Sequence, residues 1–229
     1  MQIEVWSDII CPWCGLGLHR LRAALARFEH AAEIEVVHRS FQLDERAPEG
    51  QTESVRSMLL KKGLSDPQID SVTARVAALA AEEGLAPYHV LDNQVGNTSL
   101  AHELAAWATE QGRGSALWDR LFVAYFGEKK SVFELDALVE LATSVGLDAD
   151  GARQALTSRR YAKQVRNEAR EAGQLGASGV PFFVIDRKFA IGGAQPAPVL
   201  LQALSEAWQE RAKLTAAAQP ESAGEPKSS

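Results

Sequence analysis

The sequence predicts an α/β fold that is interrupted by a large all-helical insertion. Strand-like segments lie only near the two ends of the chain, at residues 3–6, 34–38, 181–185 and 188–191. Between about residues 52 and 173, apolar residues repeat at helical spacing, so only helices are expected there. Two motifs lie next to predicted strands, one close to each end of the chain. They narrow the prediction beyond a general α/β fold.

The first motif is Cys11-Pro12-Trp13-Cys14, which holds both cysteines of the chain. It follows the first predicted strand and opens a helical pattern. A helix N-terminus favours negative charge, so the thiolate of Cys11 is expected to be stabilised and to react readily. Cys14 lies one helical turn further on and can close a disulfide with Cys11. Pro12 fits the first helical turn, where no backbone donor is needed.

A Cys-x-x-Cys motif can also be half of a four-ligand zinc site. The chain has no second cysteine pair, and no two of its histidines have the H-x3–5-H spacing of zinc ligands; the five are His19, His30, His38, His89 and His102. The strand-to-helix setting favours redox chemistry instead. We therefore expect no metal site.

The second motif is Gly179-Val180-Pro181, which runs directly into an apolar strand. Proline is tolerated at the first residue of a strand, and this is the simpler explanation of Pro181. Together with the cysteine motif, the position favours a cis bond between Val180 and Pro181. A Cys-x-x-Cys motif after the first strand and a Val-Pro pair before a late strand are the arrangement of the thioredoxin fold.

These motifs resemble those of the DsbA family of thioredoxin-fold oxidoreductases, and within it the cytoplasmic FrnE-type branch linked with polyketide biosynthesis. The matching residues are spread over nearly the whole chain: Ser7 to Gly15, Phe41 to Asp44, Ala47 to Gly50, Asn97, Thr98, Ala101, His102, Leu121 to Phe126, Gly179 to Phe183 and Gly192 to Pro196. The resemblance implies thiol–disulfide exchange or isomerisation through a mixed disulfide. It makes Cys11 the nucleophile and Cys14 the resolving thiol, with Pro181 beside them.

Two other function classes stay open. The same superfamily contains kappa-class glutathione transferases and 2-hydroxychromene-2-carboxylate isomerases, which commonly have serine where this chain has Cys11. A glutathione-dependent transferase or isomerase acting on a small aromatic substrate is therefore the alternative, and Cys11 counts against it. A peptide-binding module with unimportant cysteines is the third class. No cofactor is expected besides the cysteine pair, and glutathione stays open as a co-substrate.

Further residues are candidates for shaping the active site. Pro12, Trp13 and Val180 flank the two predicted catalytic cysteines and Pro181. His102 is included as well, although an ordinary helical histidine explains it more simply. Asp8 is either a loop acid or a buried group that relays protons. For the aromatic residues between Trp118 and Phe126, the favoured expectation is a place in the core. The alternative is that they line a substrate groove.

The chain is expected to divide into a discontinuous thioredoxin-like domain, residues 1–41 and 166–213, and a helical insertion, residues 42–165. The insertion is expected to cover the active-site end as a lid. Residues 214–229 are rich in Ala, Ser, Glu and Pro and predict a disordered tail.

The composition and the N-terminal sequence limit the binding partners and the localisation that we expect. A net charge of −6 gives no indication of nucleic-acid binding, and no apolar run is long enough to span a membrane. The N-terminal residues form a strand pattern instead of a secretory signal, so a cytoplasmic protein is expected. Its predicted partner is a protein or small molecule with a thiol or disulfide group. The sequence leaves the oligomeric state open.

Overall fold

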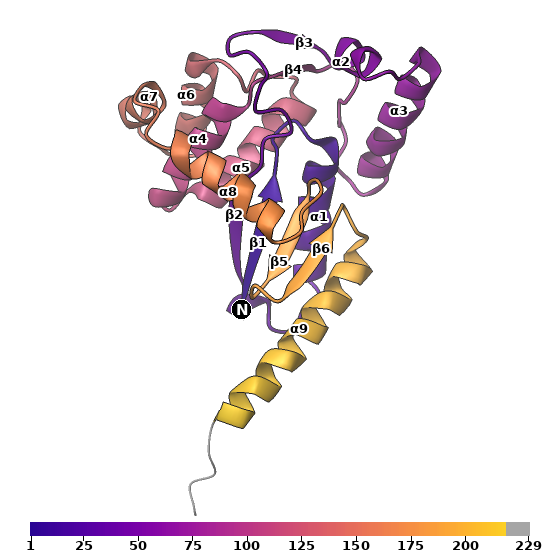
Figure 1. Ribbon diagram of the computed structural model, residues 1–229, viewed down its shortest axis with the longest axis vertical. Helices are drawn as coiled ribbons and strands as arrows, with labels where there is room; N and C mark the ends of the chain where they lie inside the picture. Colours follow the sequence, from indigo (N-terminus) through magenta and orange to yellow (C-terminus); the bar gives the residue numbers. More distant parts are fainter. Residues whose placement is uncertain (219–229) are drawn as a thin grey trace, which may run out of the picture.

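The computed structural model describes residues 1–218 and contains a sheet with the strand order β2-β1-β5-β6 (Figure 1). Its strands are β1 (Gln2–Ser7), β2 (Glu35–Ser40), β5 (Phe182–Ile185) and β6 (Phe189–Gly192). β1 pairs in parallel with β2 and antiparallel with β5, and β5 is antiparallel to β6. The sheet is thus assembled from the two ends of the chain, as the sequence predicts.

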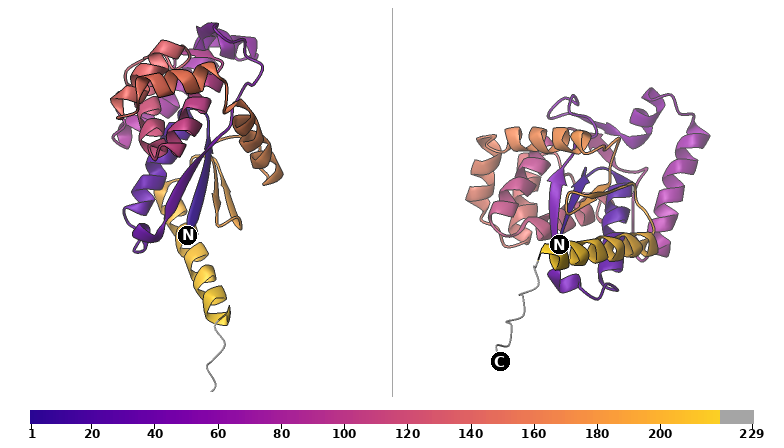
Figure 2. Two further views of the ribbon diagram at one scale, coloured as in Figure 1. Left: turned by 90° about the vertical axis from the view of Figure 1, so that its left-hand side faces the viewer. Right: turned by 60° about the horizontal axis from the view of Figure 1, so that its bottom comes forward.

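The central strands β1 and β5 are buried on both faces of the sheet, and their alternate residues point to opposite sides. Val5 and Phe183 are register partners and belong to the main core, to which the helices α1 (Pro12–Leu25) and α9 (Ala197–Ala218) contribute. Trp6 and Phe182 are the next register partners and pack on the opposite side. Ala172, from α8 (Ala162–Gln174), covers this second cluster. A helix layer therefore lies on each side of the sheet (Figure 2).

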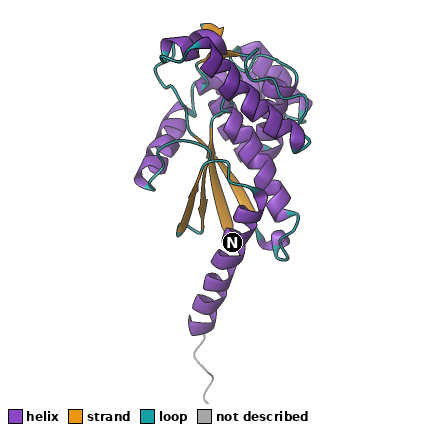
Figure 3. Cartoon of the chain, turned by 90° about the vertical axis from the view of Figure 1, so that its right-hand side faces the viewer, coloured by secondary structure: helices purple, strands orange, loops and turns teal. Residues whose placement is uncertain are grey.

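The remaining helices gather at the end of the sheet where β1 leads into α1, whereas α9 extends from the other end (Figure 3). No helix within residues 1–218 is long and apolar enough to cross a membrane. The helices between β2 and α8 are α2 (Val55–Lys61), α3 (Asp66–Glu82), α4 (Ser99–Glu110), α5 (Gly114–Phe122), α6 (Leu135–Ser144) and α7 (Ala149–Thr157).

The prediction of an exclusively helical insertion is wrong in one place. Two short strands, β3 (Thr52–Ser54) and β4 (Gln94–Gly96), pair antiparallel within it. Each has only three residues, which is too short for an alternating pattern to appear in the sequence. The pairing also joins segments that are separated by two helices, so no local turn signal indicates it.

Two predicted boundaries fall inside helices. The division between insertion and thioredoxin-like domain, at residues 165 and 166, lies within α8. The tail predicted from residue 214 begins inside α9, which continues to Ala218. The rest of that tail, residues 219–229, lies outside the described residues. The domain limits themselves stay a prediction.

The aromatic residues between Trp118 and Phe126 all belong to the core. Trp118 and Tyr125 are buried in the core of the protein, as first expected. Phe122 and Phe126 also belong to this core, but they line a cavity against α1 as well. Phe122 ends α5, and Phe126 lies in the π-helical turn that follows it, Val123–Gly127. Tyr125 lines a separate cavity, and a role of these aromatic residues in a substrate groove stays a prediction.

Replacing Trp118 with alanine is expected to lower the free energy of unfolding by about 3–5 kcal/mol. The indole is almost completely buried and lies between the rings of His38 and His102, with centroid distances of 5.5 Å to each. Denaturant unfolding of the variant and the wild type measures the difference. A loss below about 1 kcal/mol would contradict the assignment of Trp118 to the core.

Candidate active site

Cys11 lies at the junction between β1 and α1. It is the N-cap residue of α1, with extended backbone angles of φ −81° and ψ 112°, and Pro12 takes the first helical position. The Cys11 amide donates to the Asp8 carbonyl at 3.1 Å, which closes the turn after β1. Because helix N-termini carry unpaired N–H groups, this position favours a negatively charged sulfur.

The two thiols differ in their surroundings. Cys11 is 4% exposed, and its Sγ lies 3.7 Å from the Val180 carbonyl oxygen, to which it can donate. Cys14 is completely buried one turn further along α1. Burial raises the pKa of the Cys14 thiol well above its ordinary value, and the neighbouring Cys11 raises it further. Both cysteines are free thiols in the structure.

Cys11 is therefore expected to react with iodoacetamide about tenfold or more faster than Cys14 at neutral pH, because a raised pKa leaves less thiolate. Mass spectrometry of the alkylated peptides, followed over time, measures both rates. Cys11→Ser and Cys14→Ser variants assign the signals. Equal rates for the two thiols in the folded protein would contradict this expectation.

The Val180–Pro181 segment is held against the cysteine helix. Its peptide bond is cis, and the Pro181 carbonyl accepts the Gly193 amide at 2.8 Å. The proline ring packs so tightly on α1 that a Cβ at Gly17 would lie 2.8 Å from its Cγ. The missing side chain at Gly17 thus lets the loop approach the helix closely enough for the Val180 carbonyl to reach Cys11.

Trp13 and Pro12 lie between the cysteines and face different surroundings. Trp13 is 37% exposed and offers an apolar surface beside the motif. The Pro12 carbonyl accepts a hydrogen bond of 2.6 Å from the hydroxyl of Tyr88. Tyr88 belongs to the insertion, so this contact ties the insertion to the active-site motif. Burial raises the pKa of Tyr88 well above its ordinary value, which keeps its hydroxyl protonated as a donor.

Asp8 is a buried acid in the loop after β1, and a role in relaying protons stays a prediction. It is fully inaccessible, and its Oδ2 accepts the Leu43 amide at 2.8 Å. His102 is equally buried on α4, and its Nε2 lies 3.2 Å from Asp8 Oδ1. His102 thus reaches the residues that precede the cysteine motif, and its contact is with Asp8. A hydrogen bond with the Asp8 backbone lowers the pKa of Cys14, and the charge of Asp8 raises it by a smaller amount.

The structure gathers the sequence-predicted candidates at one end of the sheet: the cysteines, Pro12, Trp13, Val180 and Pro181 directly, and His102 through Asp8. Tyr88 is the residue that sequence reasoning missed. It stands in a connection after Pro87 with no motif around it, so nothing in the sequence marks it. Only the tertiary contact with Pro12 shows its place.

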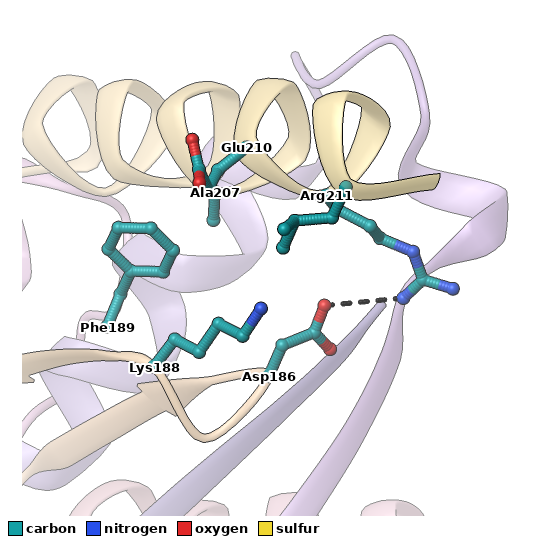
Figure 4. A pocket seen from close by; sticks show the side chains of 7 residues that line it. Asp186, Lys188, Phe189, Ala207, Glu210 and Arg211 are labelled. Carbon is teal, nitrogen blue, oxygen red and sulfur yellow. Dashed lines mark hydrogen bonds and ion pairs between the residues drawn. The ribbon is translucent and has the colours of Figure 1, made fainter. Parts of the chain in front are cut away.

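Another cavity lies away from this site. A space of about 360 Å³ opens between α9 and the turn that joins β5 to β6 (Figure 4). Figure 4 shows Asp186 paired with Arg211 at one side of it and Phe189 at the other. Asp186 also accepts the amide of Gln2, so this cavity lies where β1 begins, whereas the cysteines follow its end. It has no part in the cysteine chemistry.

A dithiol at the start of a helix that follows the first strand, with a cis-proline loop beside it, defines a thioredoxin-fold protein of the type with a helical insertion. The family model described as a DsbA-like thioredoxin domain matches residues 2–205. The chain belongs to this DsbA-like family of oxidoreductases.

Solved structures agree with this assignment. A probable DsbA oxidoreductase from Streptomyces coelicolor is 47% identical, with a TM-score of 0.88, over 92% of this chain and 91% of that one. Two more distant structures share the fold. A 2-hydroxychromene-2-carboxylate isomerase is 15% identical, with a TM-score of 0.70, over 93% of this chain and 99% of its own. The cytosolic disulfide reductase DsbM from Pseudomonas aeruginosa, solved with glutathione, is 18% identical, with a TM-score of 0.57, over 94% and 100%.

Proposed function

We propose that the protein is a thiol–disulfide oxidoreductase or isomerase of the FrnE-type branch, acting in the cytoplasm, in which Cys11 attacks and Cys14 resolves. The observation that carries this proposal is the asymmetry of the pair. Cys11 caps a helix N-terminus beside the Val180 carbonyl, whereas Cys14 is fully buried behind it with a raised pKa. An attacking thiol needs a stabilised thiolate, and a resolving thiol must stay unreactive until a mixed disulfide has formed.

In the proposed reaction, the Cys11 thiolate attacks one sulfur of a substrate disulfide, and the other sulfur leaves as a thiolate that takes up a proton. Cys14 then loses its proton and attacks Cys11 Sγ. This releases the second substrate thiol and leaves a disulfide between Cys11 and Cys14. The substrate gains two electrons and two protons, and the cysteine pair loses them. The reverse sequence oxidises a dithiol substrate, and the reduction potential decides the direction.

The surroundings of Cys11 support a substrate that carries a thiol or disulfide on a protein or small molecule. The exposed face of Trp13 can cover an apolar part of such a substrate. Backbone groups of Val180 and Pro181 can pair with an extended segment beside the sulfur. Glutathione is a further candidate because the DsbM structure, which shares this fold, was solved with it.

The alternative is a glutathione-dependent isomerase or transferase for small aromatic substrates. The observation in its favour is the shared fold with the 2-hydroxychromene-2-carboxylate isomerase, which extends over nearly the whole of both chains. Cys11 is the residue that separates the two proposals, because disulfide exchange needs the sulfur pair and isomerisation does not.

Reduction of insulin by dithiothreitol, followed by turbidity, tests the proposal beside a glutathione-conjugation assay and an isomerase assay with 2-hydroxychromene-2-carboxylate. We expect the wild type to accelerate insulin reduction and Cys11→Ser to fall to the uncatalysed rate. Cys14→Ala is expected to accumulate a mixed disulfide with its substrate, which dithiothreitol releases. Activity in the isomerase or conjugation assay alone, unaffected by loss of Cys14, would favour the alternative and refute disulfide exchange.

A further inference from the structure

A second cavity, of about 290 Å³, lies behind the active-site helix and belongs to no step proposed above. It is bounded by α1, by the 84–88 segment and by the turn that follows α5. Neither cysteine lines it, and neither does Val180 or Pro181. Its size falls at the lower end of the range of small-molecule sites, so a protein segment does not fit inside it.

The walls of this cavity are apolar and partly aromatic: Leu18, Leu85, Pro87, Tyr88, Phe122 and Phe126. Three of the rings are nearly parallel. Tyr88 stacks on Phe126 with a centroid distance of 4.5 Å and an interplanar angle of 14°. Phe122 follows Phe126 at 6.3 Å and 17°. Phe126 is only 1% exposed and Tyr88 is stacked on it, so a flat molecule in the cavity would meet ring edges and the partly exposed ring of Tyr88. Such edge contacts are favourable for aromatic groups.

The polar residues of the cavity limit the charge of a ligand. They are His19, Arg22 and Asp119. Arg22 and Asp119 form an ion pair with each other, so neither offers an unpaired charge to a ligand. A neutral donor or acceptor such as a hydroxyl can still hydrogen-bond to the Asp119 carboxylate or to the His19 ring. The cavity is therefore suited to a planar aromatic molecule with a neutral polar group.

The cavity shares a wall with the active-site motif. Tyr88 lines the cavity with its ring and donates its hydroxyl to the Pro12 carbonyl at 2.6 Å. Gly15, next to Cys14, also lines it, and a Cβ at this position would lie 2.4 Å from the Tyr88 oxygen. A displacement of the Tyr88 ring toward α1 therefore meets Gly15, and a displacement away from α1 lengthens the hydrogen bond to Pro12.

We propose that this cavity binds a small planar aromatic molecule with a neutral polar group, and that binding changes the reactivity of Cys11 through the hydrogen bond from Tyr88 to Pro12. The binding does not depend on the proposed redox function. The coupling depends only on Cys11 being the reactive thiol, which alkylation measures without any substrate.

Calorimetric titration of the full chain with 2-naphthol tests the binding. We expect saturable binding of one molecule, weakened about tenfold or more by Val123→Trp, because Val123 lines the cavity and an indole there takes up its space. Val123 is 53% exposed, so the larger side chain does not have to be accommodated in the core. Val72→Trp is the matched control, since Val72 is 46% exposed and lies outside the cavity; this variant should bind like the wild type. Absence of saturable binding, or equal binding by both variants, overturns the proposed site.

The coupling is tested by the rate of Cys11 alkylation with and without saturating 2-naphthol. We expect a change of about fivefold in the wild type. Tyr88→Phe should keep the binding and lose the change in rate, because it removes only the hydroxyl. Tyr125→Phe is the matched control: its hydroxyl also donates at 2.6 Å to a backbone carbonyl, that of Gln94, but it does not line the cavity. An unchanged rate in the wild type, or a full response in Tyr88→Phe, refutes the coupling. Neither result depends on whether insulin is reduced.

Discussion

Replacing Asp8 with alanine is expected to lower the free energy of unfolding by about 3–5 kcal/mol. The Asp8 carboxylate is fully buried, and each of its oxygens has a partner. Oδ2 accepts the Leu43 amide, and Oδ1 faces the Nε2 of His102. Alanine leaves both donors without an acceptor in a place that water does not reach, and a buried unpaired polar group costs more than its hydrogen bond contributes.

Urea unfolding at neutral pH measures this loss. Arg56→Ala is the control, because Arg56 pairs with Asp66 and Asp70 on the surface, where such pairs contribute about 0–1 kcal/mol. Asp8→Asn should fall between wild type and alanine, since its amide oxygen can still accept one of the two hydrogen bonds. A loss of less than about 1 kcal/mol in Asp8→Ala would show that the buried pair does not stabilise the fold.

The second large effect is a dependence of stability on pH that arises from His38. Burial lowers the pKa of His38 from 6.5 to about 4, and the charge of Arg22 contributes. The ring stacks on Trp118, and its buried Nδ1 has no hydrogen-bond partner among the described residues. An unfolded chain therefore takes up a proton below pH 6.5, whereas the folded chain takes it up only below about pH 4. The folded state loses about 3 kcal/mol of stability as the pH falls through this window.

His38→Phe keeps a ring against Trp118 and removes the titrating group. Between pH 6.5 and pH 4, the free energy of unfolding of this variant should fall by about 3 kcal/mol less than that of the wild type. Denaturant unfolding at several pH values gives both curves, and an NMR titration of the His38 ring should show a midpoint near pH 4. Parallel curves for the two proteins would mean that His38 has the same proton affinity in the folded and unfolded chain.

Much of the active site could be predicted from the sequence because its parts are specified locally. A strand, a short turn and then Cys11-Pro12 place a thiol at a helix N-terminus through backbone geometry. A glycine, a valine and a proline before a β-rich run likewise place Pro181 at a strand start. The order of these segments along the chain then brings both to the same end of one sheet.

The rest depends on contacts between distant segments, which leave no periodic signal. Tyr88 reaches Pro12 across the interface between the insertion and α1. His102 finds Asp8 because α4 passes over the end of β1, although its own surroundings in the sequence are those of an ordinary helix. The pairing of β3 with β4 is of the same kind, since three-residue strands gain their stability from tertiary packing and not from their own sequence.

The contact between Cys11 and Val180 spans 169 residues, and this has a consequence for biosynthesis. At a translation rate of about 5–20 residues per second, the ribosome adds the intervening residues in roughly 10–30 s. During that time β1 can pair with β2, but its other edge has no partner and the cysteine helix lacks the loop that covers it. The nascent chain thus carries an uncovered dithiol through most of its synthesis. The loop that contains Val180 can cover the cysteines only after most of the chain has been synthesised.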